Sequence, residues 1–394
     1  MTTAPLDDIR VLDLSRVLAG PWATQLLGDL GAEIIKVEKP DGGDDTRTWG
    51  PPFLGDSDKG LSAYFLSANR GKKSVTIDFS KPEGQQLIRE LAQKSDVLVE
   101  NFKVDGLAKL GLDYATLSKL NPKLVYCSIT GFGQNGPHKD RAGYDLIVQA
   151  MGGLMSVTGG ADAEPTKAGV ALTDIMTGIY ASSAILAALY ERKTSGEGQH
   201  IDLCLLDVQI CTLANQAMNY LVSGDIPVRH GNAHPNIVPY QSFETSSGHI
   251  VIAIGNDSQF VRFCEILGEP SLPADPRFKT NAARVYNRVA LLDILKRKIL
   301  AADGKDLLLK LDATGVPAAP INALDAVFSD PQISARGLAV ERQIDGLADP
   351  VRLLGNPIHF SRTPIANRRV PPSLGDSTNE ILSTLLGMDE RAIN

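Results

Sequence analysis

The sequence predicts an α/β protein whose N-terminal part forms a doubly wound, Rossmann-like parallel sheet. Short apolar runs alternate there with longer stretches of helical periodicity, which is the pattern of repeated βαβ units. The chain has 394 residues, of which 43% are hydrophobic and 22% are charged, as in an ordinary globular protein of two or three domains. We therefore expect a large α/β domain together with a smaller one.

The first βαβ unit lies at the N-terminus. Residues 9–14 predict a strand, and Pro21 suits the first turn of a helix that runs to Leu30, where Gly31 ends it. Residues 33–38 predict the second strand. The pattern continues with three more expected strands, at 73–78, 97–99 and 124–129, and with a helix at 82–94.

Ligands bind beyond the carboxyl ends of the strands in open parallel sheets. The loops that follow the expected strands are residues 17–20, 39–47, 101–103 and 131–144. We therefore expect the functional site on these loops.

The second half of the chain predicts a different kind of domain. A helix with a buried face is expected over 175–192, followed by a strand from Ile201 and one long helix through Leu213, Ala217 and Leu221. Residues 224–239, rich in Gly, Pro, His and Asn, predict a linker. A hairpin with Gly248 in its turn should follow, and then helices at 259–267, 285–301 and 305–311. The predicted domains are 1–222 (large α/β), 223–322 (small α+β) and a C-terminal segment, 323–394.

Composition and charge argue against several classes of protein. A net charge of −7 is not that of a general nucleic-acid binder. The four cysteines form no CxxC pair and the six histidines no HExxH motif, so we expect reduced core thiols and no protein-bound metal. The N-terminus lacks signal or transit character and no run of 18 apolar residues occurs, so we expect a cytoplasmic protein without a membrane span.

Asp174 stands where the helix over 175–192 begins, and its position allows two interpretations. Its carboxylate can cap the helix by accepting hydrogen bonds from free backbone N–H groups. It can also be a nucleophile at the positive end of the helix, where the same N–H groups are available to an oxyanion. Position alone favours the cap.

Gly131-Phe-Gly-Gln-Asn-Gly136 matches the GxGxxG pattern and follows an expected strand. A dinucleotide site also needs a helix that opens at the third glycine. Pro137 to Gly143 show no helical periodicity, so we expect an ordinary loop.

Basic residues near the expected strand ends are a second candidate feature. They comprise Lys39, Arg47 and the group Asn69–Lys73. A ligand with several phosphates would give them a shared role, whereas solvated surface is the ordinary alternative. The chain has no GxSxG motif and no cysteine beside an evident base, which leaves Asp174 as the candidate covalent nucleophile.

Taken together, these motifs resemble the class III CoA-transferase family, which also contains α-methylacyl-CoA racemases. The resemblance runs in order along essentially the whole chain. The matching segments are Val11–Pro21, Leu30–Glu38, Gly43–Arg47, Val99–Phe102, Ala142–Asp145, Leu172–Asp174, Thr194–Gln199, Gly315–Pro317 and Pro372–Gly375. The resemblance implies a two-domain, ring-shaped chain that is interlocked with a second copy, and a C-terminal segment that returns to the large domain.

The resemblance also implies that Asp174 is the catalytic residue and that it carries CoA as an aspartyl thioester. Acyl-CoA and carboxylic acids would be the substrates, with no metal and no separate cofactor. The positions that match CoA or substrate contacts are Val17, Leu18, Ala19, Lys39, Asn101, Phe102, Lys109, Tyr144 and Asp145. Lys39 and Lys109 stand where several relatives have arginine, so they would hold a phosphate as point charges only.

Two departures from the family pattern narrow the expected activity. The racemases have histidine at the place of Tyr144, and tyrosine is a poor proton shuttle at neutral pH. Formyl-CoA:oxalate transferases have glutamine at the place of Leu18 and a run of glycines near residues 232–238. The pattern here looks most like the succinyl-CoA:dicarboxylate branch, which includes succinate–hydroxymethylglutarate (glutarate) CoA-transferases. His234 would then bind a distal carboxylate, or else stabilise its own loop.

Three alternatives stay open from the sequence. They are a formyl-CoA:oxalate-type transferase, a racemase-like isomerase and a CoA-ester-binding protein without turnover. The acceptor acid is not fixed, since small dicarboxylates differ by one or two carbons or a hydroxyl group.

Overall fold

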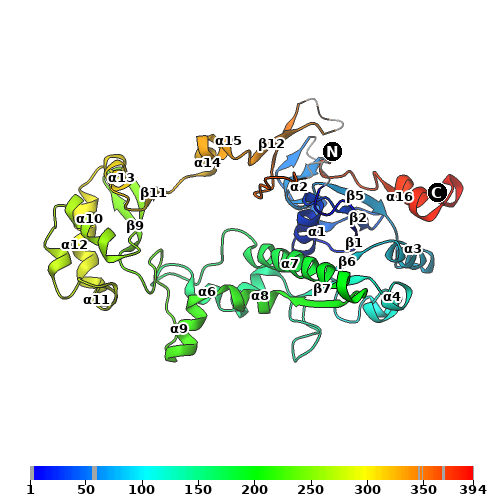
Figure 1. The fold of residues 1–394 in the computed structure, drawn as a ribbon, viewed down its shortest axis with the longest axis horizontal. Coiled ribbons are helices and arrows are strands. Elements are labelled where there is room, and N and C mark those ends of the chain that lie inside the picture. Colours follow the sequence, from blue (N-terminus) through cyan, green and yellow to red (C-terminus); the bar gives the residue numbers. More distant parts are fainter. Residues whose placement is uncertain (1–3, 56–59, 345–346, 348, 366–368, 394) are drawn as a thin grey trace. The chain divides into compact units, whose positions relative to one another are not determined.

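The computed structural model describes residues 4–55, 60–344, 347, 349–365 and 369–393 (Figure 1). The chain divides into two compact units. Unit 1 comprises Met1–Leu154, Ala168–Leu221 and Gln332–Asn394, and unit 2 comprises Met155–Lys167 and Val222–Pro331. The sequence analysis places Met155–Lys167 with the large domain. These residues join unit 2 because the Arg229 guanidinium donates to the carbonyls of Gly160 and Ala163, and Gly231 N donates to Gly159 O.

A six-stranded parallel sheet forms the centre of unit 1. Its order is β5-β2-β1-β6-β7-β8, which is the doubly wound order with its switch point between β1 and β6. The predicted α/β fold with a parallel sheet is confirmed. The strands are β1 (Arg10–Asp13), β2 (Glu33–Glu38), β5 (Lys72–Thr76), β6 (Val97–Glu100), β7 (Val125–Thr130) and β8 (His200–Cys204). Short antiparallel pairs are β3 (Phe53–Leu54) with β4 (Leu61–Ser62), and β12 (Ala339–Arg342) with β13 (Val351–Leu354).

Helices cover both faces of this sheet because successive strand residues alternate between two hydrophobic cores. Val11, Val97 and Val99 face one core, whereas Leu12 and Leu98 face the other. The first core is closed by α1 (Ala19–Asp29), α5 (Asp145–Met151), α7 (Leu172–Ser195) and α8 (Leu205–Thr212). The second is closed by α3 (Pro82–Gln93), α4 (Tyr114–Leu120) and α16 (Thr378–Leu386).

The other short elements are η1 (Asp45–Thr48), α2 (Ala63–Ala68), η2 (Ala108–Leu110), α6 (Leu154–Val157), α15 (Pro331–Ala335) and α17 (Glu390–Ile393).

Helix α7 packs closely against α1. A Cβ atom on Gly178 would lie 2.7 Å from the carbonyl oxygen of Ala19, so only glycine permits this approach. Among the described residues, α7 is the one helix whose length and hydropathy would suit a membrane span. Its residues Ile185 and Leu189 are buried in the first core, which accounts for its apolar character. The expected buried face is wrong at Ile179, which is 40% exposed.

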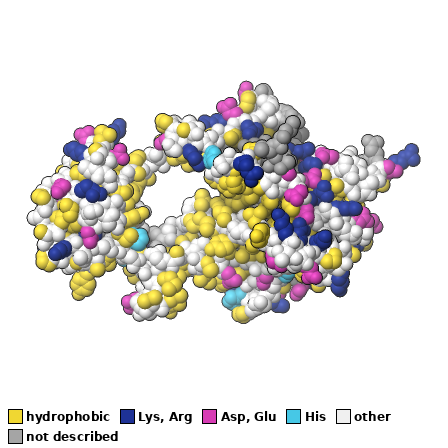
Figure 2. Space-filling model, viewed as in Figure 1, with side chains coloured by type: hydrophobic (Ala, Val, Ile, Leu, Met, Phe, Trp, Pro, Cys, Tyr) yellow, Lys and Arg dark blue, Asp and Glu magenta, His cyan; other side chains and the backbone are white. Residues whose placement is uncertain are grey.

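The long helix predicted through Leu213, Ala217 and Leu221 is wrong. The chain forms α8 and a separate α9 (Asn215–Ser223), because Ala214 adopts a left-handed conformation with φ of 46°. Helix α9 exposes large apolar side chains, those of Met218, Tyr220 and Leu221. Figure 2 shows apolar surface gathered in this part of the chain.

The four cysteines are free, as predicted from their spacing. Cys127, Cys204 and Cys264 are buried. Cys211 is exposed, so the expectation that all four lie in a core is wrong for this residue.

Unit 2 is an α+β body around a three-stranded antiparallel sheet of order β11-β10-β9. The predicted hairpin is confirmed, with Gly248 at φ of 124° where the second strand begins. Phe243, Ile252, Phe263 and Leu295 lie in its core. Its elements are β9 (Tyr240–Thr245), β10 (Gly248–Ala253), α10 (Asp257–Ile266), η3 (Leu272–Ala274), α11 (Asn281–Tyr286), α12 (Arg288–Leu300), α13 (Gly304–Ala313), β11 (Ala318–Pro320) and α14 (Leu324–Ser329).

Candidate active site

A cavity of about 460 Å³ lies beyond the carboxyl ends of β1, β6 and β7. This is the switch point of the sheet, where doubly wound folds bind ligands. Three of the predicted loops line the cavity, with residues from Arg16–Ala19, Asn101–Leu107 and Lys139–Tyr144. Asp174 also lines it. The structure therefore brings together residues far apart in the sequence.

Asp174 lies in the first turn of α7, as predicted, but it does not cap the helix. The cap comes from Asp145 in the first turn of α5. The Asp145 carboxylate accepts hydrogen bonds from the N–H groups of Thr173 at 2.9 Å and Asp174 at 3.3 Å. Asp145 also accepts a bond from Gln149. Because another residue caps α7, the Asp174 carboxylate is left for the cavity.

Two effects raise the pKa of Asp174 to about 7. Burial has the larger effect, and the negative charge of Asp145 adds to it. The carboxylate form of Asp174 therefore increases as the pH rises through about 7. Burial, followed by the charges of Asp174, Asp145 and Asp44, also raises the pKa of the Tyr64 hydroxyl. The sequence analysis missed Tyr64, which packs edge-on against Trp49 with ring centroids 5.1 Å apart.

The expectation that free N–H groups at the start of α7 serve an oxyanion is wrong. Those of Thr173 and Asp174 donate to Asp145, and those of Leu172 and Ile175 donate to the carbonyls of Val170 and Ala171. Helix α1 begins at the same cavity, which Leu18 and Ala19 line. The first N–H groups of a helix have no partner within the helix. The N-terminus of α1 is thus a candidate source of backbone donors at this site.

The loop before α1 is held in a strained conformation. Val17 has φ of 71°, which a β-branched residue rarely adopts. Its N–H donates to both oxygens of Asp44, each at 3.3 Å. Asp44 is buried and forms an ion pair with the buried Lys36 at 2.9 Å, and Lys36 also donates to Ser15 O. Burial alone would raise the pKa of Asp44, but the charge and hydrogen bonds of Lys36 and the bonds from Thr46 lower it to about 2.

A second buried ion pair supports the same loop. Lys72 donates to Asp13 at 3.1 Å and to Pro21 O at 2.9 Å, and both charged side chains are fully buried. Asp13 also accepts bonds from Ser15 and Thr24. Such pairs are costly to break, because removing one partner leaves a buried charge, at about 3–5 kcal/mol.

The hypothesis of a shared phosphate role for the basic group Asn69–Lys73 and Arg47 is wrong. These cations are used within the fold. Arg47 forms a two-pronged pair with Glu38, Arg70 pairs with Asp29, Lys72 with Asp13, and Lys73 with Glu33 and Glu380.

Asn101 joins the loops that follow β1 and β6. Its side-chain oxygen accepts from Arg16 N at 2.9 Å, and its amide donates to Arg16 O at 2.7 Å. The Arg16 guanidinium lies over the Phe102 ring, 5.3 Å from its centroid. Asn101 thus holds the cavity wall in place through its two hydrogen bonds to the backbone of Arg16.

The remaining predicted residues fall into three groups. Val17, Leu18, Ala19, Phe102 and Tyr144 line the cavity, and Tyr144 is 63% exposed. Lys39 lines an adjoining cavity of about 210 Å³ that shares Arg16 and Phe102, and it pairs with Asp45 at 3.3 Å. Lys109 is exposed on η2 and is not among the lining residues of either cavity.

Sequence reasoning missed the basic residues that do line the main cavity, namely Arg16, Lys103, Lys139 and Arg141. Each lies in or beside a loop that follows a strand, and this position is the sequence feature that could have identified them. No single motif marks these residues as a group.

His234 belongs to unit 2. Its Nδ1 accepts a hydrogen bond from Asn236 N at 3.0 Å, and its ring packs against Tyr240. These contacts match the loop-stabilising alternative for this residue.

The GxGxxG segment forms a loop, as predicted, since the next helix begins at Asp145. Gly131 packs against Gly143, where a Cβ atom would lie 2.6 Å from a backbone atom, so close packing explains that glycine. Within the described ranges, no three His, Cys, Asp or Glu residues are grouped to hold a metal ion.

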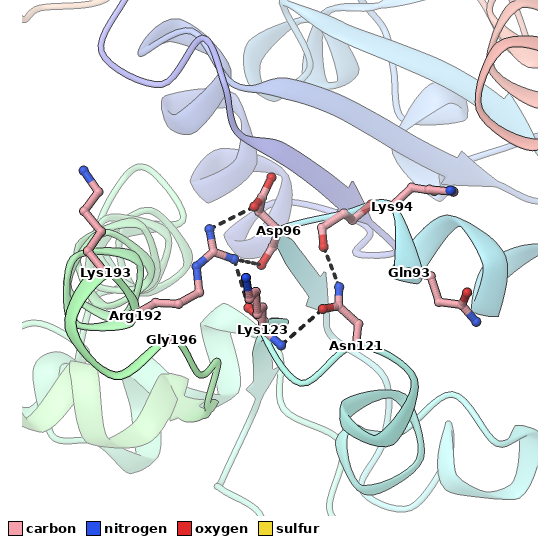
Figure 3. Close-up of a pocket in the computed structure, with 9 residues that line it drawn as sticks. Gln93, Lys94, Asp96, Asn121, Lys123, Arg192, Lys193 and Gly196 are labelled. Atoms are coloured by element: carbon pink, nitrogen blue, oxygen red, sulfur yellow. Dashed lines mark hydrogen bonds and ion pairs between the residues drawn. The ribbon is translucent and has the colours of Figure 1, made fainter.

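A third cavity in unit 1 lies at the amino ends of β6 and β7 (Figure 3). Arg192 donates there to Asp96 at 2.8 Å and to Lys123 O at 2.9 Å, and Asn121 donates to the carbonyls of Ala92 and Ser95. Arg192 is separated from Asp174 by about 27 Å of helix. The Arg192 bonds hold the end of α7 against the sheet. The polar groups of this cavity therefore stabilise the fold.

Comparison with known proteins places this chain in a family. The model of "CoA-transferase family III" matches residues 6–378. The succinate–glutarate CoA-transferase of Agrobacterium fabrum is 53% identical over 98% of this chain and 97% of its own length. The human succinyl-CoA:glutarate CoA-transferase is 44% identical over 99% of this chain and 88% of its own. A succinyl-CoA:mesaconate CoA-transferase of Haloarcula marismortui is 38% identical over 96% and 95%.

Solved structures agree with this assignment. A CAIB/BAIF family protein from Brucella suis has a TM-score of 0.85 and 50% identity, and the match covers 98% of this chain and 100% of that one. The hypothetical protein Rv3272 from Mycobacterium tuberculosis has a TM-score of 0.84 and 31% identity, over 96% and 100%.

The clamp of Asp44 on Val17 predicts a specific energetic coupling. Asp44→Asn should lower the free energy of unfolding by about 3 kcal/mol, since it leaves Lys36 buried without its counter-charge. In a Val17→Gly background this loss should grow by about 1 kcal/mol, because release of the strained Val17 offsets part of the loss in the unchanged chain, whereas glycine adopts φ of 71° without strain and has none to release. Denaturant unfolding of the single and double variants measures both quantities.

Val17→Ala is the matched control, since alanine keeps the Cβ atom and its strain. The loss caused by Asp44→Asn should be as large in that background as in the unchanged chain. An equal loss in all three backgrounds would show that Asp44 does not hold Val17.

Proposed function

Because the chain belongs to CoA-transferase family III, we propose that it moves CoA from succinyl-CoA to a small dicarboxylic acid through an aspartyl-CoA thioester on Asp174. The observation that carries this proposal is the Asp174 carboxylate at the cavity of the sheet's switch point, with its pKa raised to about 7 and its helix capped by Asp145. A desolvated carboxylate without a cation partner is a reactive nucleophile.

The first half of the reaction transfers CoA to the enzyme. The Asp174 carboxylate attacks the thioester carbonyl of the donor, and the C–S bond breaks to give a mixed anhydride and CoA thiolate. The thiolate then attacks the aspartyl carbonyl of the anhydride. Succinate leaves, and Asp174 carries CoA as a thioester.

The second half passes CoA to the acceptor. The carboxylate of the incoming acid attacks the aspartyl carbonyl, which expels the thiolate and forms a second anhydride. The thiolate attacks the acceptor's carbonyl in that anhydride, which yields the new acyl-CoA and restores the Asp174 carboxylate. A carboxylate suits this exchange, whereas a serine ester would be too stable to pass its acyl group to another carboxylate.

Each tetrahedral intermediate develops an oxyanion that needs preorganised donors. Leu18 and Ala19, at the start of α1, line the same cavity as Asp174, and we assign this role to their backbone N–H groups. The α7 N–H groups of Thr173 and Asp174 already donate to Asp145.

The phosphates of CoA would be held by cations at the same cavity. Arg16, Lys103, Lys139 and Arg141 line it, and Lys39 lines the adjoining one. Arginine can hold a phosphate through two parallel hydrogen bonds, which favours Arg16 and Arg141 as the main anchors.

The acceptor proposed for the first tests is glutarate. Its support is that the relatives from Agrobacterium fabrum and human named above carry glutarate in their names. A racemase is not supported, because the described residues that line the cavity include no histidine.

Covalent trapping tests the proposed function. After incubation with succinyl-CoA, hydroxylamine should convert Asp174 to a hydroxamate that mass spectrometry locates in its peptide. Asp174→Asn should lose both the adduct and, by at least about a thousandfold, the CoA transfer to glutarate. The exposed Asp162→Asn variant is the control and should keep both.

An unmodified Asp174 in an active preparation would contradict the proposal. So would exchange of the α-proton of the acyl-CoA in D₂O without any acceptor acid, since that reaction belongs to a racemase.

We also propose that two chains form an intertwined homodimer. Its support on this chain is the exposed apolar side chains of α9, where Leu221 is 72% exposed, and of the adjoining Val222 and Ile226. Surfaces of this kind are typical of protein interfaces. Analytical ultracentrifugation should give twice the mass of one chain at all micromolar concentrations, and Leu221→Glu should weaken the assembly. A single-chain mass throughout would contradict the dimer.

A further inference from the structure

Unit 2 contains a basic cavity of its own, lined by residues of that unit. It has a volume of about 270 Å³ and lies between residues 229–233, the start of β9 and helix α12. Arg229, His230, Arg288 and Lys296 all line it. The described residues contribute no carboxylate to this lining, so three permanent positive charges face a common space.

The two arginines are anchored by backbone carbonyls and not by acids. Arg229 donates to the carbonyls of the 160–163 segment, with a shortest distance of 2.8 Å to Ala163 O. Arg288 donates through Nη2 to Pro235 O at 2.6 Å and to His234 O at 3.3 Å. In the part of the chain that is described, neither arginine forms an ion pair, and the Arg288 bonds leave its Nε and Nη1 as donors.

The nearby Arg284 shows the ordinary arrangement. It is fully buried, donates to Val238 O and Phe278 O, and has the Asp257 carboxylate at 2.8 Å. Its charge is therefore compensated within unit 2. The charges of Arg229, Arg288 and Lys296 have no such counter-ion among the described residues.

The pKa values of His230 and His234 are consistent with the positive charge of this cavity. Burial, and after it the charge of Arg288, lowers the pKa of His230 and of His234. The rest of the polar lining is neutral, since Asn232 donates to the Ser242 hydroxyl at 2.9 Å. A cavity with neutral and cationic donors and no acid favours a bound anion.

We propose that this cavity of unit 2 binds a small molecule with two or more negatively charged oxygens, of the dicarboxylate or phosphate type. Its planar guanidinium groups suit the paired oxygens that both chemistries share. Its volume lies below that of sites for drug-sized ligands, which favours a compact anion. The site does not depend on the covalent step proposed for Asp174, so either proposal can fail without the other.

Side-chain NMR of histidine in the full chain tests this proposal. The resonance that disappears in His230→Gln identifies His230. Glutarate, succinate and inorganic phosphate are then titrated in turn, without any CoA ester. We expect the His230 resonance to shift and saturate. Saturation by the dicarboxylates identifies the organic acid as the source of the anion, and saturation by phosphate alone identifies phosphate.

Lys296→Gln tests whether the cavity's charge is responsible, and Arg297→Gln on the same helix is the matched control outside the lining. Lys296→Gln should raise the dissociation constant about tenfold, the effect of losing one hydrogen bond to a charged group. Arg297→Gln should change it by less than about twofold. An unmoved His230 resonance with all three anions, or equal effects of the two substitutions, would overturn the proposal.

Discussion

The candidate active site depends on the Asp145 carboxylate, which accepts hydrogen bonds from the N–H groups of Thr173 and Asp174 at the start of α7. This one contact has three consequences. It caps α7 from another helix, so Asp174 need not do so. It places a negative charge beside Asp174, which together with burial raises the pKa of this proposed nucleophile to about 7. It also occupies two N–H groups of α7, while the N-terminus of α1 lies at the same cavity.

The position of α1 is itself constrained from two sides. Gly178 lets α1 and α7 approach until Ala19 O would touch any added Cβ atom, which sets the loop before α1 beside Asp174. On the other side, the buried pair of Lys36 and Asp44 holds Val17 in its left-handed conformation. The strained backbone of Val17 and the buried charge of Lys36 are each unfavourable alone. The structure tolerates both because the Asp44 carboxylate accepts the Val17 N–H and neutralises the Lys36 charge.

The sequence predicted features that depend on local patterns. Apolar runs located the strands of the parallel sheet, and the loops after them located the cavity. Features that depend on distant pairs were missed. The cap joins Asp145 to residues 28 and 29 positions away, and Lys72 meets Asp13 across 59 residues. A lysine in a strand resembles surface until its buried partner is known, which is why the basic group was misinterpreted. The break at Ala214 has no glycine or proline to mark it.

The central claim is that Asp174 is a desolvated carboxyl group whose ionisation is tuned by Asp145. Titration of the Asp174 side-chain carboxyl by ¹³C NMR, in the unchanged chain and in Asp145→Asn, tests it directly. Asparagine keeps an acceptor for the α7 cap, removes the charge and gives up the bond from Gln149. The account predicts a pKa of about 7 in the unchanged chain and a lower one in Asp145→Asn. An Asp174 that titrates near 4, or that is unaffected by the substitution, would contradict it.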